Sequence, residues 1–337
     1  MKLAIVGASG GTNIGASLQR AALGAGHEVL FFDAARAHAG PRALRSLAWR
    51  IARRPLRLRS FSRAVVDGCR AGTAPRILIA TGAAALTAES IARIRSLDVY
   101  CVNYSTDDPW SEGHRAAWHL RALPAYHAVC TPRRANTADF AALGCRKVVY
   151  LPFGYDESLF PGEAGETAAP AVDVLFVGGA DPDRVDFITR FMRHGPPPAL
   201  VGDYWERHAS TRPHALGHKA PGVVAALTRA AKVNLCLVRR SNRDGHVMRS
   251  LEMGAIGACI LAEDTGEHRK IFGPDGECVC YFRSPEEAAL RARSLLADET
   301  ERRRLGEAVR RRIAAGRHTY GDRLSTMIAL TQDPAAR

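Results

Sequence analysis

The feature that most constrains the fold is a regular alternation of short apolar runs with longer amphipathic segments. Apolar runs occur at residues 3–6, 28–32, 76–80, 99–103, 127–130 and 147–151. The segments between them show helical spacing, as in Leu18, Ala21 and Ala22. Strands that alternate with helices form βαβ units, so the first half of the chain predicts a parallel sheet covered by helices.

The same pattern starts again after a small, polar stretch at 162–170, which we interpret as a linker. Further strands are expected at 173–177, 200–202, 232–238, 258–262 and 277–282, and helices near 182–193, 221–231, 246–256, 266–272, 285–297 and 299–315. Asp181-Pro182 is typical of a helix start, with aspartate as N-cap and proline at the first helical position. We predict an α/β protein of two doubly wound, Rossmann-like domains, residues 1–161 and 171–316, facing a cleft where ligands collect at the strands' carboxyl ends.

Length and composition agree with this architecture. The 337 residues suffice for about two domains, and 47% hydrophobic with 24% charged residues is ordinary globular usage. Disordered, collagen-like and small disulfide-rich classes are therefore excluded. The sequence contains no run of 18 apolar residues, so a transmembrane helix is not expected. The short apolar stretch at the start indicates a strand rather than a signal peptide. We expect a cytoplasmic protein whose eight scattered cysteines are mostly buried and bind no metal.

The net charge of +13 is concentrated in one segment. Nine arginines and no acidic residue lie between Arg36 and Arg63, with Trp49, Leu56 and Phe61 among them. One interpretation is a solvated pair of basic helices. Another is a surface that docks on anionic lipid, at the inner membrane face, or on an acceptor that carries phosphate. Nucleic-acid binding is not expected, because no helix-turn-helix, zinc-finger or RNA-binding aromatic pattern accompanies the charge.

Two segments of the first half follow strands and could line a site. The glycine-rich stretch 7–15, which includes Gly10 and Gly11, could line the cleft or form only a tight turn. Its spacing is not that of a nicotinamide-binding loop, for which Asp33 is a weak additional sign. Asp107 and Asp108 precede a proline; one could cap a helix while the other serves as a general base, or both could only shape the turn.

The strongest candidate is the segment 239–257, which follows an expected strand and opens a helix. Arg239, Arg240 and Arg243 precede the helix, so cationic side chains and free N–H groups would together attract a diphosphate. Glu252 lies further along the helix, where its carboxylate could accept hydrogen bonds from vicinal ribose hydroxyls. The alternative is a solvated charged loop.

At these residues the sequence resembles GT-B glycosyltransferases, and most closely the CgeB-like (spore-maturation) branch of the group-1 transferases. The stretch 243–252, RDGHVMRSLE, is similar to that branch's pattern, although Asp244 stands where the family carries the first of two glutamates. Further similarities are Asp107-Asp108-Pro109, the stretch 151–156, Gly178-Gly179 with Arg184, and the stretches 264–267, 282–287 and 318–323.

The resemblance implies a site and its residues. The C-terminal domain would bind a nucleoside diphospho-sugar, the N-terminal domain would bind the acceptor, and residues 317–337 would form a helix crossing back to the N-terminal domain. Asp107, Asp108, Arg243 and Asp244 would act in catalysis. The donor site would be formed by Gly178, Gly179, Arg184, Arg240, His246, Arg249, Glu252, Thr265, Gly266 and Glu267, with Gly10 and Gly11 facing the cleft.

The expected activity is transfer of a hexosyl group from that donor to an acceptor hydroxyl, without metal or other cofactor. Asp181-Pro182-Asp183 spells a D-x-D metal motif, but its place at a helix start favours capping. Arginines and helix dipoles can stabilise a leaving diphosphate instead. Two alternatives remain: a nicotinamide-dependent sugar-nucleotide enzyme, and a non-catalytic GT-B-like binding or scaffold protein.

Overall fold

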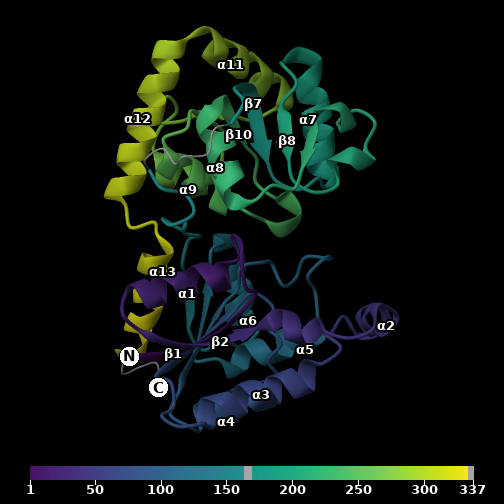
Figure 1. The fold of residues 1–337 in the computed structure, drawn as a ribbon, viewed down its shortest axis with the longest axis vertical. Helices are drawn as coiled ribbons and strands as arrows, with labels where there is room; N and C mark the ends of the chain where they lie inside the picture. Colours follow the sequence, from purple (N-terminus) through teal and green to yellow (C-terminus); the bar gives the residue numbers. More distant parts are fainter. Residues whose placement is uncertain (163–168, 333–337) are drawn as a thin grey trace. The chain divides into compact units, whose positions relative to one another are not determined.

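The computed structural model describes residues 1–162 and 169–332 and divides into two compact units. The first unit comprises Met1–Phe153, Ser241–Arg243 and the chain from Tyr320 onward, and the second comprises Gly154–Arg240 and Asp244–Thr319. Figure 1 shows the ribbon of both and labels many of their elements. Most of the expected linker, residues 163–168, lies outside the described residues.

The first unit is built on a six-stranded parallel sheet in the order β2-β1-β3-β4-β5-β6. After β1 the chain adds β2 on one side of that strand and then crosses over to add β3 on the other side. This places a topological switch point between β1 and β3, which is where open α/β sheets bind ligands. The strands are β1 (Lys2–Gly7), β2 (Glu28–Asp33), β3 (Ile77–Thr81), β4 (Tyr100–Tyr104), β5 (Ala128–Thr131) and β6 (Val148–Tyr150).

Alternating side chains of these strands explain how helices cover the sheet. Ala4 and Val6 of β1 pack in one core cluster with Phe61 and Val65, which lie on α3. On α13, Leu324 is buried, and this helix lies beside α1, so the prediction that the C-terminal helix returns to the N-terminal domain is confirmed (Figure 1). The helices of this unit are α1 (Ile14–Gly24), α2 (Arg42–Ala52), α3 (Leu58–Arg70), α4 (Ala88–Arg95), α5 (Ala117–Ala122), α6 (Thr137–Ala142) and α13 (Tyr320–Ala329).

The second unit has its own six-stranded parallel sheet, in the order β12-β11-β10-β7-β8-β9. This is the doubly wound dinucleotide-type order, with the switch point between β7 and β10. The predicted α/β class with two Rossmann-like domains is therefore confirmed. The strands are β7 (Val172–Val177), β8 (Ala199–Val201), β9 (Ala215–Gly217), β10 (Ala231–Cys236), β11 (Ile260–Glu263) and β12 (Cys280–Phe282).

The two faces of this sheet follow from the two-residue period of β7. Val174 and Phe176 pack with Phe187 and Phe191 of α7, whereas Leu175 packs in a second cluster with Val224 of α8. Each face is thereby covered by helices, as a parallel sheet requires. The helices are α7 (Pro182–His194), α8 (Pro221–Ala230), α9 (Met248–Ile256), α10 (Gly266–Phe272), α11 (Pro285–Ala297) and α12 (Glu299–Ala315).

Three further sequence expectations can be compared with the structure. All eight cysteines are free, and all but Cys280 are fully buried, so their interpretation as small core residues is confirmed. β9 was not predicted, because Ala-Leu-Gly is too short and too small to show a strand pattern. In residues 1–162 and 169–332, none of the helices has both the length and the hydropathy needed to cross a bilayer.

Candidate functional site

At the switch point of the second unit, the backbone of the turn after β7 packs directly against the backbone that follows β8. Gly178 follows β7, its N–H donates to the Val201 carbonyl, and its own carbonyl accepts a 2.7 Å hydrogen bond from Trp205 Nε1. Gly202 has a φ of +141°, and a Cβ there would lie 2.3 Å from the Gly178 carbonyl oxygen. Glycine at 202 is what allows the Gly178-Gly179 turn to sit this close to the neighbouring strand.

Arg184, in the first turn of α7, is buried beside this turn. Asp181 caps the helix by accepting a 2.9 Å hydrogen bond from the Arg184 N–H, which is the capping predicted for the Asp-Pro-Asp sequence. The Arg184 guanidinium donates to the Gly179 carbonyl at 3.2 Å, whereas its Nε makes no hydrogen bond and forms an ion pair at 3.5 Å with the Asp181 carboxylate. Burial lowers the pKa of Arg184, the charge of Asp181 opposes that effect, and the nearby Arg239 adds to it. A buried cation with an unused donor is an environment that an anion would stabilise.

A cavity of about 210 Å³ lies next to Arg184, at the carboxyl end of β10. Its lining includes Val238, Arg240 and Glu263. Glu263 ends β11, accepts a hydrogen bond from the Val238 N–H at 3.2 Å and pairs with Arg240 at 2.8 Å. The sequence analysis included Arg240 but not Glu263, which lies between the expected strand 258–262 and the stretch 264–267. The signal that could have identified Glu263 was its position at the carboxyl end of a strand.

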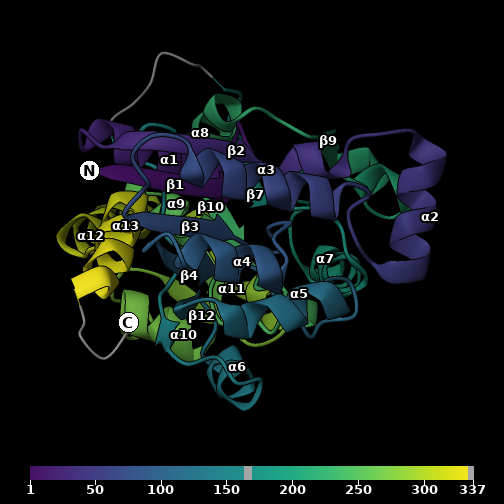
Figure 2. The ribbon, with the colours of Figure 1, turned by 90° about the horizontal axis from the view of Figure 1, so that it is seen from below.

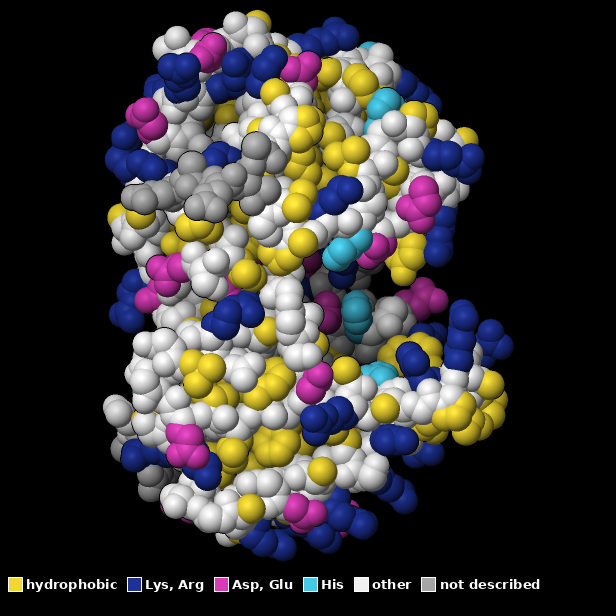
Figure 3. Space-filling view, viewed as in Figure 1, with side chains coloured by type: hydrophobic (Ala, Val, Ile, Leu, Met, Phe, Trp, Pro, Cys, Tyr) yellow, Lys and Arg dark blue, Asp and Glu magenta, His cyan; other side chains and the backbone are white. Residues whose placement is uncertain are grey.

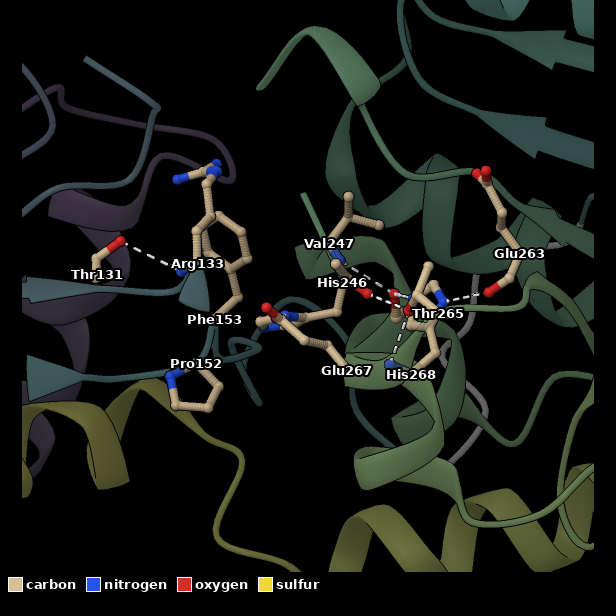
Figure 4. Close-up of polar contacts among 12 residues, drawn as sticks. Thr131, Arg133, Pro152, Phe153, His246, Val247, Glu263, Thr265, Glu267 and His268 are labelled. Carbon is tan, nitrogen blue, oxygen red and sulfur yellow. Dashed lines mark hydrogen bonds and ion pairs between the residues drawn. The ribbon is translucent and has the colours of Figure 1, made fainter. Parts of the chain in front are cut away.

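The loop 244–247 forms hydrogen bonds with residues at the start of α10. His246 is buried, and its Nδ1 lies 2.6 Å from a carboxylate oxygen of Glu267, while the Thr265 hydroxyl donates to the Gly245 carbonyl. Figure 4 shows His246, Thr265 and Glu267 close together. Three residues assigned to one site from sequence, His246, Thr265 and Glu267, are thus brought together by the fold.

His268 contacts two elements beside this cluster. One ring nitrogen lies 2.8 Å from the Glu263 carbonyl oxygen and the other 2.8 Å from the Ser250 hydroxyl (Figure 4). Because a carbonyl can only accept, Nδ1 carries the proton and Nε2 accepts from Ser250. Burial lowers the pKa of His268 to about 4, so the ring is neutral near pH 7. His268 therefore joins β11 to α9 as a structural residue.

Glu252 lies on α9 and is 3% exposed, so it does not point into bulk water. Its Oε2 lies 2.6 Å from Nη1 of Arg249, but the orientation is not that of a hydrogen bond, and both atoms are buried without a hydrogen-bond partner. Burial raises the pKa of Glu252, and the charge of Arg249 opposes that effect. This pair has unused hydrogen-bonding capacity that a ligand hydroxyl could satisfy.

In the first unit, the glycine loop after β1 lies at the switch point of that sheet. Gly10 and Gly11 have positive φ values of 73° and 54°, a conformation that explains the paired glycines. The Ser9 hydroxyl donates to Asp33 at the end of β2, at 2.7 Å. Burial alone would raise the pKa of Asp33, but this bond and backbone donors hold it below its usual value.

Asp107 and Asp108, which follow β4, have different environments. Asp107 is 41% exposed and lies 3.7 Å from His114. Asp108 is buried; it accepts a bond from the Asn136 amide at 3.0 Å and is paired with Arg243, whose second partner is Asp139 at 2.7 Å. Burial would raise the pKa of Asp108, but the hydrogen bond from Arg243 and other donors lower it overall.

Several residues around Asp108 were missed by sequence reasoning. Asn242 accepts a 2.8 Å hydrogen bond from the Asp108 N–H, and it belongs to the first unit together with Ser241 and Arg243. Arg133 is buried and donates to the Thr106 carbonyl at 2.7 Å. Asn242 lies in the candidate segment 239–257 but was given no role there, and Arg133 stood in no recognisable motif. The guanidinium of Arg243 is held by two carboxylates, so a phosphate would have to compete with both.

Comparisons with known proteins match part of the chain by sequence and the whole chain by structure. Residues 184–329 match the family described as "Glycosyl transferase-like". None of the curated protein sequences matches this chain. The match includes Arg184, Arg240, His246, Glu252 and Glu267, whereas Gly178 and Gly179 lie before it, so most of the candidate site of the second unit falls within a glycosyltransferase-like sequence.

Solved structures resemble the whole chain. Sucrose-phosphate synthase from Thermosynechococcus elongatus has a TM-score of 0.70 at 13% identity and covers 98% of each chain. Anabaena HepE in complex with UDP-glucose has a TM-score of 0.66 at 14% identity and covers 98% of this chain and 99% of its own. A Listeria monocytogenes protein described as a UDP-N-acetylglucosamine 2-epimerase reaches 0.58 at 10% identity, covering 98% and 95%. The chain therefore has the GT-B fold of two Rossmann-like domains, and its residues 184–329 are glycosyltransferase-like in sequence.

Proposed function

We propose that this protein is a glycosyltransferase that moves a hexosyl group from a nucleoside diphospho-sugar to an acceptor hydroxyl. The observation that carries the proposal is the buried Arg184, whose Nε makes no hydrogen bond and whose ion-pair partner is Asp181 at 3.5 Å, at the switch point of the unit that contains most of the glycosyltransferase-like sequence. Parallel α/β sheets bind ligands at that point, and a diphosphate is the anionic part of such a donor. Assignment to the CgeB-like branch remains part of this proposal.

The donor would be held by groups from three loops. Arg184, Arg240 and the Gly178-Gly179 turn would face the diphosphate, since they supply cationic groups next to a glycine turn after β7. Glu252 would accept hydrogen bonds from the ribose hydroxyls, which supply the donors that its buried oxygen lacks. His246, Glu267, Thr265 and Gly266 would border the nucleotide from the start of α10, and Arg249 would hold Glu252 in place.

Catalysis would consist of positioning and of charge stabilisation. The acceptor oxygen forms a bond to the sugar's anomeric carbon, the bond from that carbon to the diphosphate oxygen breaks, and the hydroxyl proton goes to a base. Arginines aimed at the leaving diphosphate stabilise the negative charge that it gains. We propose that these side chains replace a metal ion, and that Asp244 takes the place of the family's first glutamate near the sugar.

The first unit would bind the acceptor, with the Gly10-Gly11 loop at its switch point. Of the two aspartates, Asp107 is the better candidate for a base, because it is partly exposed and its neighbour at 3.7 Å is His114 rather than an arginine. Asp108 and Arg243 bind one another, so we assign them a positioning role in holding residues 107–108. If the reaction retains configuration, neither aspartate need act as a base.

A nucleotide-sugar epimerase is the second candidate, because a protein described as one shares the fold. The two activities differ in what they consume. A transferase releases nucleoside diphosphate in proportion to glycosylated acceptor, whereas an epimerase changes the sugar without needing an acceptor.

Thermal-shift measurements with UDP, GDP and TDP test the donor site. A nucleotide at about 100 times its Kd adds about 2.7 kcal/mol, or about 5–10 °C for a domain of this size. Arg184→Ala should weaken nucleotide binding by about tenfold or more, because a charge-assisted hydrogen bond is lost. Arg293→Ala, an exposed arginine on α11, is the matched control and should change nothing.

Absence of any shift with all three nucleotides, or equal binding by wild type and Arg184→Ala, would overturn the assignment. Glu252→Gln and Arg243→Ala refine it. The first should weaken binding of the ribose-containing ligand, whereas the second should leave nucleotide binding intact and lower turnover. Adding EDTA to a transfer assay should not reduce the rate if arginines rather than a metal stabilise the leaving group.

A further inference from the structure

Helix α2 differs from the other α-helices of the described residues in that it buries none of its own residues. Its arc of Leu44, Leu47, Ala48 and Ile51 follows the three- and four-residue spacing of a single helix face. On that arc Leu44 is 50% exposed, Leu47 53% and Ile51 77%. Burying these side chains would be favourable, so α2 presents an apolar face without a partner among residues 1–162 and 169–332.

The surroundings of this face are strongly basic. None of the nine arginines from Arg36 to Arg63 forms an ion pair within residues 1–162 and 169–332. On α2 itself, Arg45 and Arg50 flank the apolar arc on opposite sides, about 100° from its centre. In Figure 3 dark blue and yellow side chains gather over α2, and Figures 1 and 2 show this helix apart from the sheet of its own unit.

A groove of about 650 Å³ adjoins the C-terminal end of α2. It is lined by Ile51 and Trp118 and by the arginines Arg53, Arg54, Arg59 and Arg121. Its acidic residue is Glu89, which is already paired with Arg93 at 2.7 Å. Trp49, 38% exposed, lies near the same end, with the Arg53 guanidinium 6.0 Å from its ring. The groove therefore offers cationic groups for phosphates directly beside an apolar helix face.

From this arrangement we infer that α2 and the adjoining arginine groove dock on the surface of an anionic phospholipid bilayer. The arc of Leu44, Leu47 and Ile51 enters the acyl boundary, and the flanking arginines contact headgroup phosphates. Charge complementarity selects this occupant. A second copy of the chain would bring two arginine-rich faces together, and a nucleic-acid backbone would give the leucine and isoleucine side chains no apolar environment.

Flotation with lipid vesicles tests the inference with the full chain. Wild type should bind vesicles of phosphatidylcholine mixed with phosphatidylglycerol, bind pure phosphatidylcholine vesicles much less, and lose binding as salt rises. Arg45→Gln/Arg50→Gln should lower the partition coefficient by about fivefold per arginine removed. Leu47→Glu/Ile51→Glu should lower it more than tenfold, since two carboxylates oppose both burial and the anionic surface.

Matched controls come from α11, where Leu290 is 61% exposed and Arg293 is exposed. Leu290→Glu and Arg293→Gln should bind vesicles as wild type does. Because α2 buries no residue, its variants should keep the wild-type melting temperature and the wild-type thermal shift with nucleoside diphosphate. Membrane docking and donor binding can therefore fail independently of each other.

Three results would overturn the inference. The first is equal flotation of wild type and both α2 variants. The second is concentration-dependent dimerisation, abolished by Leu47→Glu/Ile51→Glu, without vesicle binding; it would identify the face as a self-association surface. The third is tight binding to a soluble polyanion that Leu47→Glu/Ile51→Glu retains while vesicle binding is absent.

Discussion

At the scale of single residues, adjacent or similar side chains have different roles because of their environments. Asp107 and Asp108 are neighbours in sequence, yet one is partly exposed and the other buried and held by an arginine. Glu252 and Glu263 are both carboxylates of the second unit, but Glu263 pairs fully with Arg240 whereas Glu252 keeps a buried oxygen without a hydrogen bond. Burial and partners, rather than residue type, decide which of them can serve a ligand.

Asp108→Asn should destabilise the first unit by about 1–3 kcal/mol, because Arg243 and Asn136 lose a charged acceptor. The pKa of Asp108 is lowered in the folded state, so its contribution is complete above the ordinary aspartate pKa, about 3.9, and disappears as pH falls below that value. Denaturant unfolding from pH 7 to pH 3 measures this. A deficit that stays constant over the whole range would contradict the assignment.

The pH dependence of stability between pH 6.5 and 4 should come largely from buried histidines. Burial lowers the pKa of both His119 and His268 to about 4, below the usual 6.5. The unfolded chain therefore binds protons first, and each histidine should cost about 1 kcal/mol of stability per pH unit as pH falls through this window. His268→Gln should be less stable at pH 7 but flatter between pH 6.5 and 4 in urea unfolding. An unchanged slope would show that another group titrates.

At the scale of elements, the loops after β7 and β10 form the candidate donor site. The Gly178-Gly179 turn lies against Gly202, and Arg184 reaches the turn from the first α7 residues. The capping aspartate and the glycines could be recognised in the sequence. Their close packing at one switch point depends on the strand order, which places β7 between β8 and β10.

Two glycine substitutions should therefore change the stability of the second unit in opposite directions. Gly202→Ala would place a Cβ 2.3 Å from a backbone oxygen at a φ of +141°, and should destabilise the second unit by about 1–3 kcal/mol and weaken nucleotide binding. Gly222→Ala, in the first turn of α8 with open space around it, should stabilise the unit by up to about 1 kcal/mol. Calorimetry of both variants checks the pair; a stabilising Gly202→Ala would mean that the turn is not tightly packed.

At the scale of the whole molecule, each of the two units is built from more than one segment of the chain. α13 belongs to the first unit, where Tyr320, Leu324 and Met327 are buried and Arg323 donates two hydrogen bonds to the Phe153 carbonyl. Stability of the N-terminal sheet thus depends on α13, which is distant from it in sequence.

Calorimetry should separate the two units, since multidomain chains need not unfold in one step. Met327→Ala should remove about 2–5 kcal/mol from the first unit, and Phe191→Ala about 3–5 kcal/mol from the second. A nucleoside diphosphate should raise only the transition that Phe191→Ala lowers. A nucleotide that raised only the other transition would place the donor site in the first unit.

The sequence by itself determined the class of fold and the candidate segments. Apolar runs of strand length that alternate with helical segments require parallel sheets, and capping residues, glycine turns and a basic loop are local signals. Strands such as β1 and β7 and helices such as α7 were therefore predictable to within a residue or two.

Only the tertiary structure decided which side chains meet and which are already paired. Glu263, Asn242 and Arg133 acquire their roles from residues distant in sequence, and Arg243 binds Asp108 and Asp139 although it precedes a helix typical of diphosphate sites. Likewise, helical spacing could not tell that α2 leaves its apolar face exposed while α3 buries its own. Periodicity reports which side chains share a face, whereas burial depends on what the rest of the chain places against that face.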